Sequence, residues 1–369
     1  MSVLAVVFGA SLVLAVLADL VNTLVTTSTS QWRWWPTRIL YRGSWAVVST
    51  LGAKIKDDGR RERVYRLFAP LSVLVMLLAW VAQQVIGFGF ISWGIGGVSG
   101  IDGLMDSIYF SGVVFFTVGF GEVVPIEQVP RFLALIEAFA GVLTTALVVG
   151  YLPALYAAYS EREQKLLTLD DGSEERITPT NLVIARSPDG DPRELDAFFT
   201  EWEAWIAQVL ETHTSHSMLV LFRSQHPGQS WITALGLVAD AALNIELTKR
   251  GQGRSAYWAL RRASRLLRDL TDGADLSEYR KTLDETYEGD NPQLREIYDQ
   301  MKDHGFEMLP YDIAVLHSRD LRRTYDAQLE FLIDQLQAPR GFWGHEMGHR
   351  MHQRPLEVVV DQGSSSSAQ

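Results

Sequence analysis

The chain has 369 residues, a formal net charge of −11 and a mean hydropathy of +0.03. The acidic balance excludes nucleic-acid binding as a main role, because no strongly basic domain is present to neutralise phosphates. The absence of cysteine excludes disulfides and thiolate metal sites. Residues 1–160 are strongly apolar, whereas residues 161–369 are charged and amphipathic. The sequence therefore predicts a membrane part followed by a polar helical part.

Three apolar runs, at about residues 3–25, 67–90 and 132–156, are long enough to span a bilayer as helices. The first lacks the basic start of a cleaved signal peptide, so we interpret residues 1–27 as a retained transmembrane helix. It has no repeated arginines, so no voltage sensor is predicted. Asp19 is a costly intramembrane carboxylate; we favour an interfacial position or a hydrogen bond to a neighbouring helix over a transport role.

Basic residues predict the orientation in the membrane. The segment 28–66 carries nine of them, whereas only Arg131 lies between the second and third runs. The positive-inside rule places that basic segment and everything after Tyr159 in the cytoplasm, and the N-terminus outside the cell. Tryptophans beside the arginines predict a helix over about residues 36–53, lying flat on the inner membrane surface.

The segment between the second and third runs has the pattern of a re-entrant loop. A helix over about 103–116 is too short to span the membrane, and glycines and Pro125 follow it. Glycine reaches positive φ without penalty, so successive carbonyls of the following segment could face one axis and replace the water around an ion. That segment is Thr117, Val118, Gly119, Phe120 and Gly121. The short helix would direct the partial negative charge of its C-terminus toward the ion.

Over residues 67–160 the sequence resembles the tetrameric potassium channels with a two-helix pore. Thr117-Val118-Gly119-Phe120-Gly121 matches their selectivity filter, with Phe120 where tyrosine is commoner. The resemblance implies a homotetramer that conducts K⁺ passively, with K⁺ as the permeant ion, no cofactor and no enzymatic activity. Membrane lipids and further copies of the chain are the implied partners, nucleic acid is not, and the ligand of the cytoplasmic part is unknown.

The resemblance also indicates how the filter is supported. Tyr109 and Phe110 match the aromatic pair that packs around it. Glu122 stands where aspartate is usual, and Val113 stands where some members carry a glutamate bonded to that aspartate. The carboxylate pair is therefore absent, and we expect the filter to be held more by packing than by polar contacts.

The third span offers candidate gating hinges. Gly141 matches the hinge glycine of the lining helix, and Gly150 with Pro153 forms a second flexible point. The alternative is that these residues serve helix packing alone. Residues 160–164 are similar to the polar exit of this helix into the cytoplasm.

Residues 161–190 are interpreted as a linker that could form a hairpin. The domain 191–340 is predicted to be helical, and the tail 341–369 flexible. The domain's expected helices cover about 193–211, 229–249, 254–271, 291–303 and 310–337. We expect the arginines at 261, 262, 265 and 268 to pair with local acids rather than bind anionic lipid, and we expect His213, His216 and His226 to lie on the surface.

His345-Glu346-Met347-Gly348-His349 fits the HExxH zinc pattern. We favour coincidence, because Gly348 weakens the required helix and a downstream glutamate ligand is not evident. The predicted fold is an all-α membrane protein with three transmembrane helices, a re-entrant pore helix and filter loop, and a helical cytoplasmic domain. A potassium channel is the leading interpretation. A weakly selective cation channel and a membrane-anchored zinc peptidase using His345, Glu346 and His349 are the alternatives.

Overall fold

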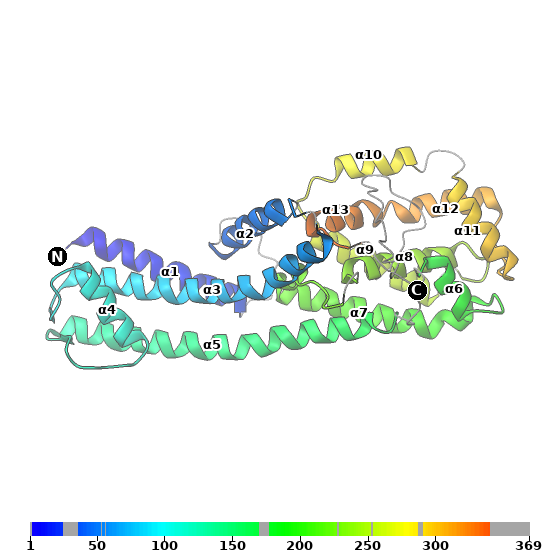
Figure 1. Ribbon diagram of the computed structural model, residues 1–369. Helices are drawn as coiled ribbons and strands as arrows, with labels where there is room; N and C mark the ends of the chain where they lie inside the picture. The colour runs from blue at the N-terminus through cyan, green and yellow to red at the C-terminus, as the bar shows by residue number, and fades with distance from the viewer. Residues whose placement is uncertain are drawn as a thin grey trace, which may run out of the picture.

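Two long helices, α3 (Asp58–Ile95) and α5 (Gln128–Leu166), run along the length of an elongated molecule (Figure 1). α1 (Val3–Leu24) lies along α3, and the C-terminal helices gather around the far end of α5. This computed structural model describes residues 2–24, 36–52, 54–55, 57–169, 177–226, 229–251, 254–286 and 291–339.

Among the described residues, three helices are long and apolar enough to cross a membrane, as predicted: Val3–Val21, Gly59–Ile95 and Gln128–Leu166. α3 and α5 extend beyond their apolar runs at the end where the C-terminal helices lie. The expected helix near 36–53 is α2 (Pro36–Gly52), where Trp45 packs against Tyr65 and Phe68 of α3.

α1 and α3 pack closely because small residues meet at their crossing. A Cβ atom on Gly9 would lie 2.3 Å from the carbonyl oxygen of Gly87, a contact that only glycine permits. Farther along the same pair, Trp80 Nε1 donates to Asp19 Oδ2 at 3.0 Å, and Asp19 is 1% exposed. The interpretation of Asp19 as a hydrogen-bond partner of a neighbouring helix is confirmed.

A short helix, α4 (Leu104–Phe115), lies between α3 and α5 as predicted. Two short strands flank this region of the chain: β1 (Val98–Ser99) pairs antiparallel with β2 (Val124–Pro125), with Val98 opposite Pro125. This pairing brings the end of α3 next to the start of α5, so α4 and the segment after it form a closed excursion.

The C-terminal part is a helical domain built around α8 (Trp231–Glu246), all of whose residues are buried. The surrounding elements are α6 (Pro179–Arg186), η1 (Pro192–Leu195), α7 (Asp196–Ser215), η2 (Ser217–Leu221), α9 (Ser255–Leu270), α10 (Ser277–Thr286), α11 (Pro292–Asp303), α12 (Tyr311–Arg322) and α13 (Asp326–Leu336).

The C-terminal part of the structure differs from the sequence prediction in three places. Residues 179–186 form a helix instead of a hairpin, and α10 was not predicted. The expected helix over 310–337 is two helices that break near Tyr325. The Tyr325 backbone leaves helical geometry with φ −141°, while its buried hydroxyl donates to Asp240 of α8. A contact with a distant part of the chain thus coincides with the break in the local helical pattern.

Candidate functional site

The Thr117–Gly121 segment is anchored to the C-terminal turn of α4. Phe116 N donates to the Gly112 carbonyl at 3.0 Å, and Thr117 N donates to the Val114 carbonyl at 3.0 Å. Val118 N donates to the Val113 carbonyl at 2.9 Å. Val113, expected as a filter support, therefore contributes through its backbone oxygen.

The backbone angle φ alternates in sign along this segment. Thr117, Gly119 and Gly121 have φ values of 54°, 63° and 89°, whereas Val118 and Phe120 are outside the positive-φ region. Positive φ is uncommon for a non-glycine residue such as Thr117, so a local constraint holds it there. A change of hand at every second residue lets successive carbonyls face the same side, whereas a uniform extended strand alternates them.

The side chains of the segment are not covered by their own chain. Val118 is 48% exposed and Phe120 is 72% exposed, although both are apolar. Exposed large apolar residues this close together are typical of a surface that another chain or lipid covers.

A polar contact joins α4 to the residue after the segment. Tyr109 Oη donates to Glu122 Oε1 at 2.7 Å, and the neighbouring Phe110 is buried. The expectation that packing dominates here was incomplete, because a phenol–carboxylate pair links the elements that the missing carboxylate pair would have joined. Tyr109 and Glu122 were both singled out from the sequence, but their mutual bond was not.

A second polar cluster lies behind α4 and was missed. Ser111 of α4 hydrogen bonds with Glu137 of α5 and lies 2.7 Å from the Val85 carbonyl oxygen of α3. Gln84 Nε2 of α3 donates to Thr144 Oγ1 of α5 at 3.0 Å. The available signal was that Glu137 is the only acidic residue in the apolar run 132–156.

The structure gives the predicted hinge residues different surroundings. A Cβ atom on Gly141 would lie 2.1 Å from the Phe115 carbonyl oxygen, so this glycine lets α5 approach the end of α4. Gly150 has no neighbouring atom within 4 Å of such a Cβ, and Pro153 lies inside an uninterrupted α5. A packing role is evident for Gly141, and the hinge role of all three residues stays a prediction.

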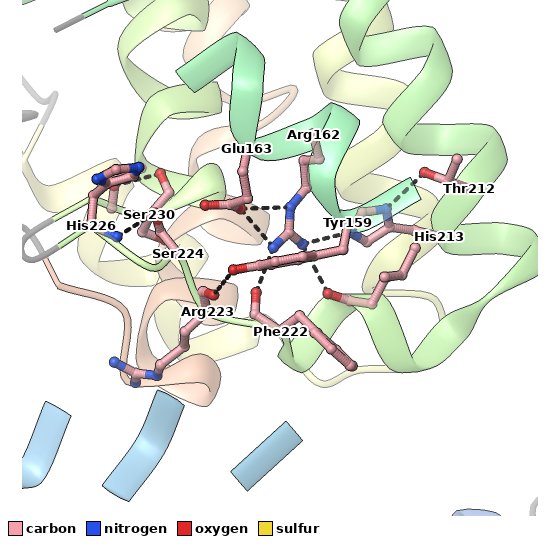
Figure 2. A network of polar contacts seen from close by, with 12 residues as sticks. Tyr159, Arg162, Glu163, Thr212, His213, Phe222, Arg223, Ser224, His226 and Ser230 are labelled. Carbon is pink, nitrogen blue, oxygen red and sulfur yellow. Dashed lines mark hydrogen bonds and ion pairs between the residues drawn. The ribbon is translucent and has the colours of Figure 1, made fainter. Parts of the chain in front are cut away.

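At its far end, α5 is fastened into the C-terminal domain by Arg162 (Figure 2). Arg162 is 2% exposed and donates to the carbonyls of Leu219 at 2.9 Å and Phe222 at 2.6 Å. It also pairs with Glu163 at 2.9 Å, and Glu163 is itself 8% exposed. Within the predicted polar exit over 160–164, Arg162 and Glu163 are therefore enclosed by protein, and the exit itself stays a prediction.

His213 completes this network from α7. Its Nε2 lies 3.3 Å from Arg162 Nη1, which can only donate, so the ring proton is assigned to Nδ1, 3.3 Å from Thr212 Oγ1. Burial lowers the pKa of His213 well below its usual range, and the charge of Arg162 lowers it further. The expectation of a surface histidine was wrong here. His216 is half-buried and stacks edge-on against Tyr151.

The stretch 219–223 also holds α3 and α13. Arg223 Nη1 donates to Glu62 Oε2 at 2.6 Å, and its guanidinium lies 4.6 Å from the centre of the Tyr65 ring. Arg223 Nη2 donates to the Leu336 carbonyl at 2.6 Å. The stretch 219–223 thus connects the ends of both long helices to the C-terminal domain, through two backbone carbonyls and the Arg223 side chain.

The remaining sequence candidates do not form a site. On α9, Arg265 pairs with the local acid Asp269 at 3.8 Å as expected, whereas Arg262 pairs at 2.8 Å with Glu203 of α7. Within the described ranges, no three histidine, aspartate or glutamate side chains gather to hold a metal ion. His345, Glu346 and His349 lie outside the described residues.

Comparison with known protein families finds a match that includes the Thr117–Gly121 segment. Residues 71–157 match the family model described as ion channel. An uncharacterized membrane protein of Bacillus subtilis, YdjJ, is 25% identical over 238 residues, which cover 57% of this chain and 64% of the relative. The match therefore spans less than two thirds of that relative, and no solved structure matches the chain. Residues 71–157 are therefore similar to an ion channel family, and the described residues include three helices long and apolar enough to cross a membrane, as in a multi-pass membrane protein.

Proposed function

We propose that this protein is a potassium-selective channel that conducts K⁺ passively through a homotetrameric pore. The observation that carries the proposal is the alternating backbone of Thr117, Gly119 and Gly121. Carbonyls facing one side can replace the hydration shell of an ion without a large change in energy. α4 ends directly at this segment, and the partial negative charge of its C-terminus favours a cation there.

The exposed apolar surface supports assembly with further copies of the chain. Exposed apolar residues repeat along α5 at the spacing of one helix face: Phe132, Leu135, Phe139, Val142 and Val149. One chain supplies one carbonyl row, whereas a ring around an ion takes four. Four copies would place these faces and Phe120 against protein. The native mass of the purified protein, measured in detergent, would equal four chains.

The orientation follows from charge. The segment before α3 carries the basic residues, so we propose that α2 and the C-terminal domain are cytoplasmic and that β1 and β2 lie outside. Because the chain has no cysteine, Ser99→Cys and Lys302→Cys each give a single labelling site. A membrane-impermeant maleimide should label intact cells only at position 99. Labelling of position 302 alone would reverse the orientation.

Flux through reconstituted protein tests selectivity. Liposomes with opposed K⁺ and Na⁺ gradients should develop a potential set by the K⁺ gradient. A conducting protein whose potential follows both ions equally would be a weakly selective cation channel. No ion flux under any gradient would refute the channel itself.

Matched glycine variants link the flux to the segment. Gly119→Ala strains a residue at φ 63° and should lower K⁺ preference or flux. Gly43→Ala is the control, because a Cβ there meets no atom within 4 Å and lies in α2, outside the pore segment. Equal selectivity and flux in Gly119→Ala and Gly43→Ala would remove the filter assignment.

A further inference from the structure

One serine hydroxyl joins the three helices behind the filter segment. Ser111 Oγ of α4 lies 2.7 Å from the Val85 carbonyl oxygen of α3 and hydrogen bonds with Glu137 Oε1 of α5. Both side chains are completely buried. The two hydrogen bonds of the Ser111 hydroxyl therefore also hold α4 in position relative to α3 and α5.

Counting protons restricts the state of Glu137. Each of the two oxygen–oxygen contacts needs a proton, and a serine hydroxyl carries one. The Val85 carbonyl can only accept, so the Ser111 proton belongs in that contact. The proton between Ser111 and Glu137 must then come from the carboxyl group, and an ionised carboxylate has none to give.

The surroundings of Glu137 also disfavour a charge. Within the described residues, no lysine, arginine or histidine lies within ion-pair distance of it, and its Oε2 has no hydrogen-bond partner. A carboxylate without a cation at membrane depth is costly. The polar contacts that α3 makes here come from the neutral Gln84 side chain and the Val85 carbonyl, and Gln84 Oε1 also lacks a partner among the described residues.

Ionisable groups of α4, of the loop after it and of the start of α5 lie against other residues. Asp106, in the first turn of α4, accepts from the backbone N–H groups of residues 102 and 103 at 3.0 Å. Arg131, six residues before Glu137 on α5, donates to the Pro125 carbonyl at 3.1 Å. In the loop between α4 and α5, Glu122 accepts from Tyr109, and the Glu127 side chain lies beside Gly97.

We propose that Glu137 holds a proton at neutral pH and acts as a neutral donor that positions Ser111, and through it the pore helix α4. Its effect on conduction rests on the function proposed above. Loss of the proton would make the carboxylate compete with the Val85 carbonyl for the one hydroxyl proton. The contact between α3 and α4 would then lose its donor, so conduction would fall as alkaline pH ionises Glu137.

Infrared spectroscopy tests the proton without any flux. The wild-type protein at neutral pH should show a C=O stretching band of a protonated carboxyl that Glu137→Gln lacks. Identical spectra in that region would overturn the proposal. Ser111→Ala keeps the carboxyl but removes its acceptor, so it should shift the band. An unshifted band would refute the bond to Ser111, even if Glu137→Gln failed to fold.

Flux measured across a pH series tests the positioning role. The amide of Glu137→Gln can donate to Ser111 but cannot ionise in this range. Wild-type flux should fall at alkaline pH, whereas Glu137→Gln should keep its neutral-pH flux throughout. Parallel loss in both proteins would overturn the role. A wild-type protein with the band but without K⁺ flux would refute the proposed function and leave the proton on Glu137 established.

Discussion

Replacing Arg162 by methionine removes the side chain that fastens α5 to the C-terminal domain. Methionine has a similar length and no charge, so the change deletes donors and leaves most of the apolar volume. Four acceptors lose their donor: the carbonyls of Leu219 and Phe222, the carboxylate of Glu163 and Nε2 of His213. The prediction concerns the free energy of unfolding of the C-terminal domain in the full chain.

The magnitude follows from the burial of these groups. A buried acceptor without a donor costs about 1–3 kcal/mol. Breaking a buried ion pair by removing one partner costs about 3–5 kcal/mol. The side chain of Glu163 keeps 11% of its exposure and can turn toward water, so the separate costs do not add fully. We expect Arg162→Met to lower the free energy of unfolding by about 3–5 kcal/mol.

Denaturant unfolding of the full chain in detergent measures this loss. Tryptophan fluorescence reports on the region, because the Arg162 guanidinium lies 5.4 Å from the centre of the Trp231 ring. Arg265→Met is the matched control: its pair with Asp269 is exposed, and such helix pairs contribute about 0.2–0.5 kcal/mol. Equal unfolding free energies for the two variants would refute the assigned role of Arg162.

Three further predictions follow from the geometry. Because the pKa of His213 is lowered in the folded state, the unfolded state binds more protons below about pH 6.5. The free energy of unfolding should therefore fall as pH drops from 7 to 5, and it should depend less on pH in His213→Gln than in the wild type. The same pH dependence in both proteins would contradict the role assigned to His213. Gly141→Ala should reduce flux or assembly, because its Cβ would lie 2.1 Å from the Phe115 carbonyl oxygen of α4, whereas the Cβ of Gly150→Ala meets no atom within 4 Å. If single-channel recordings show the same open probability in both glycine variants as in the wild type, the packing role of Gly141 and the hinge roles of Gly141 and Gly150 are refuted. Tyr109→Phe should weaken K⁺ selectivity, because it removes the hydrogen bond to Glu122. Adding Glu122→Gln to that variant should change the reversal potential little further, because the bond is already lost. Independent effects of the two substitutions on the reversal potential would refute the coupling.

Local properties made much of the membrane part predictable. The length of an apolar run is enough to indicate a spanning helix, and α1, α2 and α4 begin and end within a few residues of their predicted bounds. The positive φ values at Gly119 and Gly121 agree with what glycine permits at every second position. Thr117 shares that backbone although its own side chain disfavours it, so the surrounding turn decides its conformation.

Contacts between distant residues could not be predicted in this way. Arg162 meets groups that are 51 to 60 residues away, and Tyr325 meets Asp240 across 85 residues. Neither pattern nor propensity contains that information, because it depends on how the helices pack. Arginine and histidine are usually found on protein surfaces, but Arg162 and His213 are buried here because α5, α7 and η2 pack together.

The sequence by itself determined the three apolar helices of membrane-spanning length within the described residues, and the glycine-containing excursion between the second and third, since both are set by runs of neighbouring residues. Only the tertiary structure decided what surrounds that excursion. Tyr109 reaches Glu122, Ser111 reaches Glu137, and Gly141 lies against the end of α4 because α3, α4 and α5 converge there. Side-chain chemistry is fixed by the sequence, but the partners that use it are fixed by packing.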